Sequence, residues 1–374
     1  MAPNNKTLGH VAIIGGCGFV GFNIVNLILE RYPESKIAVL DVRTDVNRLD
    51  NSSVSYNQCD ITDFSALKEL FGKLKLDTVI HTAALIPMAD SANSRKISYK
   101  VNVDGTKNLL AVSQETGVKA FVFTSSSSVV VGDVWEVINA DESWPVLVGK
   151  DQPEYYSTTK AMAEIAVLEA NRSSSSSLLT CALRPAGIFG DHDNTSLLRT
   201  LQIRGAKMCF QIGNGENLFD FTYVKNVAHA HLLAAEALLQ THTLGITPLD
   251  SERVDGEAFF ITNGEPVYFW DFIRRIWILR GMPEDKTFDL SKVWVISITV
   301  GMFFATLSEL IMGLLGRTAN FNRLSIKASA MTRYFNIDKA RMRLKYEPLF
   351  GLDEGVQRGV RQMVSQESTS EKKG

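Results

Sequence analysis

A tyrosine and a lysine stand four residues apart in the segment Tyr156-Ser-Thr-Thr-Lys160. On a helix, that spacing places both side chains on one face. A free tyrosine has a pKa of about 10, and a neighbouring ammonium stabilises the phenolate, so the phenol can act as a base near neutral pH. Tyr155 is five residues from Lys160 and lies off that face. The pair therefore indicates proton abstraction from a hydroxyl group.

Hydroxyl side chains gather directly after an apolar, strand-like run. The run ends at Phe123, and Thr124 and four serines through Ser128 follow it. Ligands bind at the carboxyl ends of strands in an open α/β sheet, where a serine can hydrogen-bond a substrate oxygen. We expect one of these serines to contact a substrate and the others to cap the strand end.

Three glycines follow the first apolar run of the chain. The run His10–Gly15 leads into a GxxGxxG spacing at Gly15, Gly18 and Gly21, and helical spacing follows. The first glycine permits a tight turn, the second lets a pyrophosphate approach the backbone, and the third allows close helix–strand packing. The amino end of the helix favours the anion. A strand before the glycines and a helix after them predict a dinucleotide site.

Asp41 ends the second apolar run, 20 residues after Gly21. A carboxylate at that place accepts hydrogen bonds from the adenosine ribose and repels a 2′-phosphate, which favours NAD over NADP. Arg43 lies close enough to accept such a phosphate, so NADP stays open as the alternative.

Short apolar runs alternate with amphipathic stretches over the first half of the chain, which predicts βαβ units and a Rossmann-type, doubly wound parallel sheet in an α/β fold over residues 1–190. We expect strands at His10–Gly15, Lys36–Asp41, Thr78–Thr82, Ala120–Thr124 and Leu178–Leu183, and helices at Phe19–Leu29, Phe64–Leu74, Val101–Thr116 and Tyr156–Asn171.

The alternation fades after Arg184, which predicts a smaller C-terminal substrate domain over residues 191–365. A strand at Ala258–Thr262 and a helix at Val227–Leu239 are expected to pack back on the first domain. The polar residues 366–374 predict a disordered tail.

The composition excludes several classes of function. The net charge is 39 minus 41, or −2, which argues against a nucleic-acid surface. The four cysteines have no metal-ligand spacing, so we expect reduced thiols and no metal. The polar start of the chain does not resemble a secretory signal peptide. We expect His81, His229 and His231 to be structural.

Residues Val293–Gly316 form an apolar stretch of 24 residues whose only charge is Glu309. That length suffices to reach across a bilayer. A single span would separate Tyr334–Pro348 from the first domain, so we expect a hairpin or a helix that lies in the interface. A buried pair of core helices is the alternative.

These motifs resemble the extended short-chain dehydrogenases, and within them the 3β-hydroxysteroid dehydrogenase family. The likeness covers about Val11 to Val364 and is greatest to its subgroup of decarboxylating sterol-4α-carboxylate dehydrogenases. Two later segments, Ile261–Phe272 and Tyr334–Pro348, carry the likeness to that subgroup. The earlier motifs are GGCGFVG at Gly15–Gly21, Asp60-Ile61, Val79–Ala84, Val101–Thr106, Thr124-Ser-Ser126 and Arg184–Gly190.

The resemblance implies roles for single residues. Ser126, as the second serine of the TSS motif, is expected to hold the substrate oxygen beside Tyr156, while Lys160 lowers the tyrosine pKa and binds the nicotinamide ribose. The expected cofactor-binding residues are Gly15, Gly18, Phe19, Val20, Gly21, Asp41, Asp60, Ile61, Ala83, Ala84, Asn102, Tyr156, Lys160, Pro185 and Ile188.

The resemblance also implies an NAD-dependent oxidation of the 3β-hydroxyl of a 4α-carboxysterol or related triterpenoid to the 3-ketone, with loss of the carboxylate as CO2. A 3β-hydroxysteroid dehydrogenase without decarboxylation is the first alternative, and a non-catalytic NAD-binding regulator is the second. The implied location is the cytosolic face of the endoplasmic reticulum membrane or lipid droplets. Membrane lipid, other proteins of sterol C4 demethylation and a second copy of the chain are the expected partners.

Overall fold

The computed structural model describes residues 7–87, 91–173, 176–193, 210–281, 293–315, 317, 319 and 321–371, with side chains through Ser365. Its core is one seven-stranded sheet in which every neighbouring pair is parallel, in the order β12-β7-β5-β4-β1-β2-β3. The strands are β1 (His10–Ile14), β2 (Lys36–Asp41), β3 (Val54–Gln58), β4 (Thr78–His81), β5 (Ala120–Thr124), β7 (Leu179–Pro185) and β12 (Ala258–Ile261).

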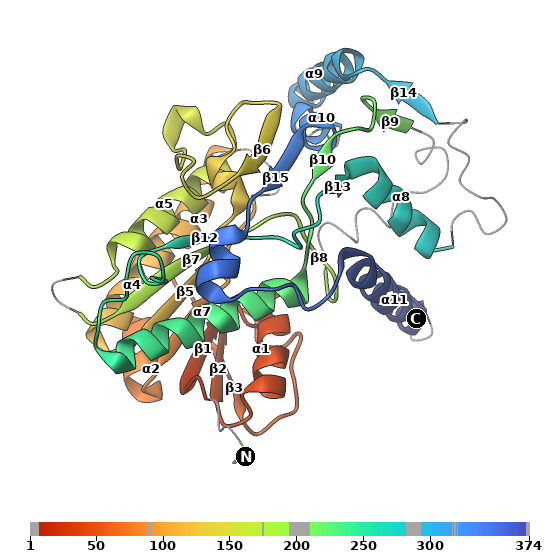
Figure 1. Ribbon diagram of the computed structural model, residues 1–374. Coiled ribbons are helices and arrows are strands. Elements are labelled where there is room, and N and C mark those ends of the chain that lie inside the picture. The colour runs from red at the N-terminus through yellow and green to blue at the C-terminus, as the bar shows by residue number, and fades with distance from the viewer. Residues whose placement is uncertain are drawn as a thin grey trace.

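Helices cover both faces of this sheet, as the alternation predicts (Figure 1). Alternate residues of β1 enter different cores: Val11 and Ile13 pack with α1 and α7, whereas Ala12 and Ile14 pack with α2, α4 and α5. The doubly wound parallel fold is therefore confirmed. The bounds are α1 (Phe19–Arg31), α2 (Phe64–Leu74), α3 (Ala92–Tyr99), α4 (Gly105–Glu115), α5 (Tyr155–Glu169) and α7 (Val224–Leu244).

A smaller sheet stands beside the carboxyl ends of the large one. Its order is β13-β10-β15-β6, and only the β10–β13 pair is antiparallel. Two further strand pairs, β8 with β11 and β9 with β14, accompany it. The strands are β6 (Glu136–Ala140), β8 (Ile188–Phe189), β9 (Phe210–Ile212), β10 (Leu218–Phe219), β11 (Thr222–Tyr223), β13 (Val267–Tyr268), β14 (Trp294–Ile296) and β15 (Thr332–Phe335).

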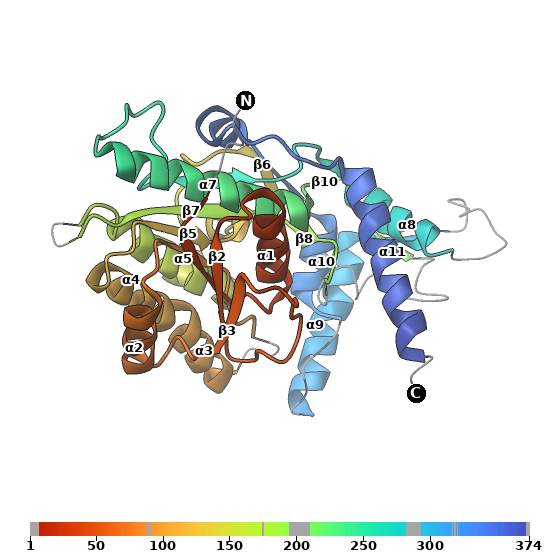
Figure 2. The same cartoon turned by 90° about the horizontal axis from the view of Figure 1, so that it is seen from below.

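Several elements cross the boundary drawn at residue 190, among them β12, α7 and β6. β12 forms an edge of the large sheet, and α7 packs against α1 and β5, although both follow the boundary in sequence. β6 precedes the boundary and lies in the small sheet. The C-terminal part also holds helices α8 (Phe269–Leu279), α10 (Arg323–Ala330) and α11 (Leu352–Glu371) (Figures 1 and 2).

Residues 366–374, which the sequence predicts to be a disordered tail, begin within helix α11. The backbone of α11 continues as a helix to Glu371. Glutamine and glutamate are good helix formers, so the polar sequence can extend the amphipathic turns before it. Residues 372–374 lie outside the described part.

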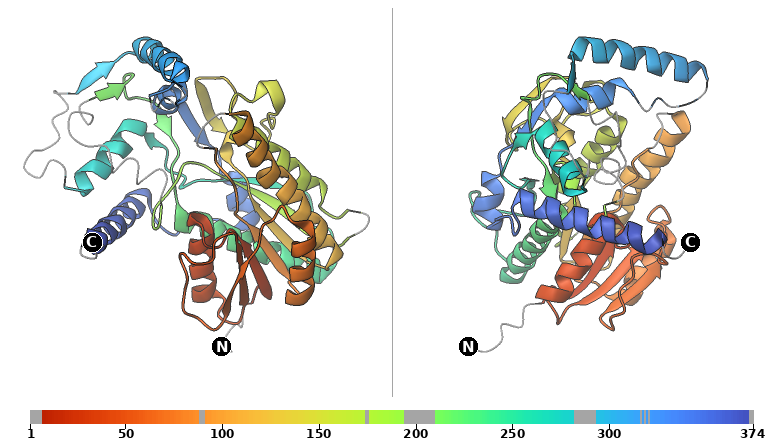
Figure 3. Two further views of the ribbon diagram at one scale, coloured as in Figure 1. Left: turned by 180° about the vertical axis from the view of Figure 1, so that it is seen from behind. Right: turned by 90° about the vertical axis from the view of Figure 1, so that its right-hand side faces the viewer.

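The apolar stretch 293–316 is divided between two elements, the strand β14 and the 17-residue helix α9 (Ile298–Leu314). Within the described residues, no helix combines the length and apolarity that crossing a membrane requires. Only Gly301 and Ala305 of α9 are buried, so the alternative of a buried pair of core helices is wrong. Figure 3 shows α9 at the end of the molecule away from the N-terminus. Lys292, which precedes the stretch, and Gly316, its last residue, lie outside the described residues.

Candidate active site

A cleft of about 680 Å³ opens at the carboxyl ends of the large sheet. Its walls come from the ends of β1, β2, β4, β5 and β7, from the start of α1 and α5, and from β15 of the small sheet. Several strands contribute because parallel strands present all their carboxyl ends at one edge. Most of the expected cofactor residues and all three expected catalytic residues therefore line a single cleft.

Two of the three glycines, Gly15 and Gly21, occupy positions that a side chain could not. Gly15 has φ +79°, and a Cβ there would stand 2.8 Å from the backbone nitrogen of Ala83. A Cβ at Gly21 would stand 2.3 Å from the carbonyl oxygen of Gly15. A Cβ at Gly18 would meet only that oxygen, at 3.1 Å. The turn, the close packing of helix on strand and the open approach to the backbone match the roles expected of the three glycines.

The amino end of α1 has the features of an anion-binding site. Gly18 is its N-cap and offers no side-chain cap, and the first turn holds no acidic residue. The first backbone N–H groups of a helix have no partner within the helix, so they can donate to a ligand. Phe19 and Val20, in this turn, line the cleft.

Asp41 lies at the adenosine end expected of the site. Its carboxylate accepts hydrogen bonds from the backbone N–H of Cys17 at 3.1 Å and of Arg43 at 3.2 Å. Asp41 and Val42 line the cleft, whereas the exposed Arg43 is not part of the lining. The Asp41 carboxylate thus lies on the wall of the cleft, whereas the Arg43 side chain is exposed and does not line it.

The structure places most of the other expected cofactor residues on the wall of the cleft. They are Asp60, Ile61, Ala83, Ala84, Pro185 and Ile188. Asn102 and Gly21 lie behind the wall. The Asn102 side chain accepts from the backbone N–H of Leu85 at 2.7 Å and donates to the Leu85 carbonyl at 3.0 Å. Asn102 therefore positions the loop that carries Leu85 and is not itself part of the lining.

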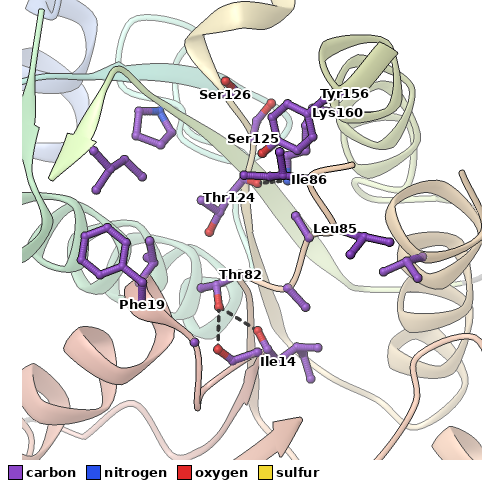
Figure 4. A pocket seen from close by; sticks show the side chains of 18 of the residues that line it. Ile14, Phe19, Thr82, Leu85, Ile86, Thr124, Ser125, Ser126, Tyr156 and Lys160 are labelled. Carbon is purple, nitrogen blue, oxygen red and sulfur yellow. Dashed lines mark hydrogen bonds between the residues drawn. The ribbon is translucent and has the colours of Figure 1, made fainter. Parts of the chain in front are cut away.

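The catalytic side chains cluster at the inner end of the cleft, where Figure 4 shows Ser125, Ser126, Tyr156 and Lys160 close together. Lys160 is 2% exposed and donates from Nζ to the carbonyl oxygen of Thr124. Nζ also lies 4.2 Å from the centre of the Phe123 ring. Burial lowers the pKa of Lys160 to about 7, although the charge of Glu164 opposes that shift.

The expected lowering of the Tyr156 pKa by Lys160 is not found in the chain alone. Burial raises the pKa of Tyr156, and the negative charge of Glu154 adds to the shift. Lys160 turns its ammonium to a backbone carbonyl and is itself destabilised as a cation by burial. A cationic nicotinamide beside the phenol would favour its phenolate, by the same rule of opposite charges.

A chain of hydroxyl groups links Ser126 to a carboxylate. The Oγ atoms of Ser126 and Ser128 are 2.8 Å apart, and Ser157 Oγ donates to Ser128 Oγ at 2.8 Å or to Glu154 Oε2 at 2.6 Å. The Oγ of Ser125 is buried and has no hydrogen-bond partner in the described part of the chain. Ser126 lines the cleft, as expected of the catalytic serine. Its neighbour Ser125 lines the cleft as well.

The three histidines that we expect to be structural each lie beside a polar side chain of the protein. His81 Nε2 lies 3.0 Å from Thr106 Oγ1, and its burial lowers its pKa to about 3, which leaves it neutral. His231 Nε2 lies 2.7 Å from Thr124 Oγ1. His229 Nδ1 lies 3.2 Å from an Arg31 nitrogen. Among the described residues, no cluster of side chains suited to a metal ion is found.

Sequence reasoning missed two residues of this site. Arg333 lines the cleft from β15, and Glu154 stands at the end of the hydroxyl chain. Glu154 could have been found from its position, because it directly precedes the helix that carries Tyr156. Arg333 precedes the recognised motif at Tyr334, but a single arginine in a short strand gives no local signal that it lines the cleft.

Comparisons with known proteins agree with this geometry. A model of the 3-beta hydroxysteroid dehydrogenase/isomerase family matches residues 12–292. The decarboxylating sterol-4-alpha-carboxylate 3-dehydrogenase of Schizosaccharomyces pombe is 37% identical over 94% of this chain and 96% of its own length. The human protein of that name is 33% identical over 96% of this chain and 89% of its own length.

Solved structures are similar in fold. UDP-glucose 4-epimerase of Thermotoga maritima, with UDP-glucose, has a TM-score of 0.68 at 21% identity and covers 96% of this chain and 99% of its own. The enzyme WbmH of Bordetella bronchiseptica, in complex with NAD+, has a TM-score of 0.69 at 17% identity and covers 95% of this chain and 98% of its own.

Proposed function

Because the chain belongs to the 3-beta hydroxysteroid dehydrogenase/isomerase family, we propose that it oxidises the 3β-hydroxyl of a 4α-carboxysterol or a related triterpenoid and releases the carboxylate as CO2. The observation that carries the proposal is the joint placement of Ser126, Tyr156 and Lys160 in the cleft that the glycine turn also lines. A regulator without catalysis would not need these three side chains together.

The residues of the cleft fit a nicotinamide dinucleotide, which when bound would accept the hydride of the C3–H bond. Tyr156, as the phenolate that a cationic nicotinamide would favour, takes the proton of the 3β-hydroxyl at Oη, and Ser126 holds the hydroxyl oxygen. The resulting β-keto acid can lose CO2, because the C3 ketone accepts the electron pair of the breaking bond. Tyr156 then returns its proton to the enolate. Atoms and charge balance without a dedicated decarboxylating residue.

The proposal is tested by mass spectrometry of products from purified protein and NAD. One reaction receives a 3β-hydroxy-4α-carboxysterol and a second receives a 3β-hydroxysteroid without the carboxylate. We expect the first to give a 3-ketone lighter by CO2. Oxidation of the second substrate alone would identify a dehydrogenase that does not decarboxylate, and no product from either would support the regulator.

We propose NAD as the preferred cofactor, on the place of Asp41 in the lining and of Arg43 outside it. Asp41→Ala removes ribose hydrogen bonds and the repulsion of a 2′-phosphate. We expect kcat/KM with NAD to fall about tenfold and the value with NADP to rise. Steady-state kinetics with both cofactors checks this, and Arg43→Ala is the control. A wild-type enzyme that prefers NADP would contradict the proposal and point to Arg43.

We propose that α9 lies in the interface of a membrane, at the cytosolic face of the endoplasmic reticulum or on lipid droplets. Its exposed side chains include Phe303, which is 65% exposed, and Leu314, which is 82% exposed. Trp294, just before the helix, is 72% exposed. Glu309 forms an ion pair with Arg323 at 2.7 Å, so the single acid of the stretch has a partner at the protein surface. Other proteins of sterol C4 demethylation, and a second copy of the chain, remain proposed partners.

A further inference from the structure

Three serine side chains lead from the catalytic cleft to a carboxylate outside it. The Oγ atoms of Ser126 and Ser128 are 2.8 Å apart, and both residues line the cleft. Ser157 Oγ lies 2.8 Å from Ser128 Oγ and 2.6 Å from Glu154 Oε2. Ser157 and Glu154 are not part of the lining. The three serines thus form a hydroxyl chain that ends at Glu154, a half-buried residue that can exchange a proton with water.

Backbone hydrogen bonds hold this chain in place. Gln152, which is 5% exposed, donates from its side-chain amide to the Ser128 carbonyl at 3.0 Å. Its side-chain oxygen accepts from the backbone N–H of Glu154 at 3.3 Å. Ser126 Oγ accepts from the backbone N–H of Ser128 at 3.2 Å. The two ends of the chain are therefore tied together by bonds that do not depend on where the hydroxyl hydrogens point.

The Ser157 hydroxyl has one hydrogen and two acceptors for it. It can donate to Ser128 Oγ or to Glu154 Oε2, and between Ser126 and Ser128 either oxygen can be the donor. A hydroxyl group both donates and accepts, so it can take up one proton and pass on another. The Ser157 hydrogen points to the carboxylate before a proton passes outward and to Ser128 afterwards. The geometry offers both of these states.

The contacts on the Lys160 side of the site lead into the protein. Lys160 donates to the backbone carbonyl of Thr124, and a carbonyl has no proton to pass on. Thr124 Oγ1 lies 2.7 Å from His231 Nε2, and His231 Nδ1 lies 2.8 Å from the carbonyl oxygen of Val227. Thr124 and His231 are both buried. Within the described residues, these contacts reach no carboxylate, whereas the hydroxyl chain does.

We propose that the hydroxyl chain and Glu154 relay the proton of Tyr156 out of the cleft when the phenolate forms, and relay one back when the phenol is restored. This inference rests on the proposed function, in which one substrate hydroxyl contacts both Tyr156 and Ser126. The Tyr156 O–H bond breaks, and the substrate hydroxyl takes up that proton while it passes its own to Ser126. Each serine of the chain accepts one proton and passes on its own. The Glu154 carboxylate becomes a carboxylic acid, which gives the proton to water.

Glu154 also acts on Tyr156 through its charge, and this effect has the opposite sign. The negative charge of Glu154 adds to the raised pKa of Tyr156. Without that charge the pKa of Tyr156 would fall, and more phenolate would form at a given pH. If Glu154 acted by its charge alone, its neutralisation would speed oxidation. If Glu154 accepts the relayed proton, its neutralisation slows oxidation.

The test measures NADH formation by the wild-type enzyme, Ser157→Ala and Glu154→Gln. Ser157→Ala interrupts the chain, and Glu154→Gln keeps an oxygen that accepts from Ser157 but takes up no proton. We expect each to lower kcat about 10- to 100-fold, less than the loss of the base itself, with unchanged affinity for NAD. Imidazole, a small proton carrier, should restore the rate at fixed pH. Ser113→Ala is the matched control and should change nothing, because this buried helix serine makes no side-chain hydrogen bond among the described residues.

Two results would overturn the relay: a Glu154→Gln enzyme as fast as the wild type or faster, and a loss in Ser157→Ala that imidazole does not restore. The double variant adds a third test, since both changes interrupt one route and its loss should equal that of a single variant. Losses that add would also contradict the relay. Any 3β-hydroxysteroid that the wild type oxidises serves as the substrate, so oxidation without decarboxylation would refute the proposed function and leave this test intact. A wild type that oxidises neither kind of sterol would overturn both.

Discussion

The two sheets of the molecule present different chemical groups to the cleft. The large sheet offers backbone: the turn at Gly15 and the open amino end of α1 present N–H groups, and small residues keep the approach free. The small sheet offers a charged side chain, that of Arg333 on the short strand β15. Backbone binding suits a constant cofactor, whereas side chains can be exchanged to suit a substrate without disturbing the fold.

The largest effect is expected where both sheets meet, at Tyr156. Tyr156→Phe removes the proton acceptor and keeps the ring, so turnover should fall by a factor of about 10²–10⁴ while NAD binding survives. Steady-state kinetics and fluorescence titration with NAD measure the two quantities. Near-normal turnover would end the mechanism. As a control, Tyr155→Phe alters the neighbouring phenol, which does not line the cleft, and should leave turnover unchanged.

The cofactor side is tested by a methyl group at Gly21. Gly21→Ala places a Cβ 2.3 Å from the Gly15 carbonyl oxygen, so the turn must shift. We expect a loss of about 1–3 kcal/mol in the free energy of unfolding and weaker NAD binding. Gly72→Ala is the matched control, because its Cβ on α2 meets nothing within 4 Å. That variant should gain about 0.5–1 kcal/mol from helix propensity. A Gly21→Ala protein as stable as wild type would refute the tight packing.

The same contrast explains what the sequence could predict. The strands β1, β2, β4 and β5 are continuous apolar runs bounded by turn residues, so local pattern suffices to locate them. The small sheet joins four short strands from segments far apart in the chain, and β10 and β13 have only two residues each. No periodicity exists over two residues. β3 was missed for a different reason: it forms the outer edge of the large sheet, and only Val54 in it is buried.

The site residues also fall into those that a local sequence pattern predicts and those that only the folded structure brings to the site. Tyr156, Lys160 and the glycines were predicted because their spacing along one helix or turn carries the geometry. Arg333 was not predicted, because it comes to line the same cleft as Tyr156 only when β15 pairs with β6. The raised pKa of Tyr156 depends on burial and on Glu154, and burial is a tertiary property that a spacing rule does not contain.

The pH dependence of stability tests the burial of Asp220, which directly follows β10 of the small sheet. Its pKa of about 7 in the fold exceeds the value of about 3.9 for an unfolded aspartate. Its contribution to stability is therefore fully present below about pH 4 and is lost as the pH rises through about 7. Asp220→Asn stays neutral, so its unfolding free energy should fall less between pH 5 and pH 8 than that of the wild type, by on the order of 1 kcal/mol after structural relaxation. Urea unfolding at both pH values measures the difference, and identical pH profiles would contradict the buried acid.

The smallest effect on catalysis is expected from the surface of α9. Phe303 and Leu310 are exposed and contribute to no described core cluster, so a Phe303→Ser, Leu310→Ser protein should keep its stability within about 0.5 kcal/mol and its turnover in detergent. Its binding to phospholipid vesicles should weaken by about a hundredfold or more, because each lost side chain removes about 1.5–3 kcal/mol of apolar burial.

A control pair separates membrane contact from general loss of surface apolarity. Ile246 and Leu249 are also exposed, but they lie in the loop after α7. Serine at both positions should leave vesicle binding unchanged. The helix of 17 residues is about 26 Å long, shorter than the hydrocarbon core of about 30 Å, so lying in the interface is the geometry that uses its whole exposed face. Equal losses in both variants would show that α9 has no special part in membrane binding, and release of the wild type by salt alone would show that charge, not apolar burial, holds it there.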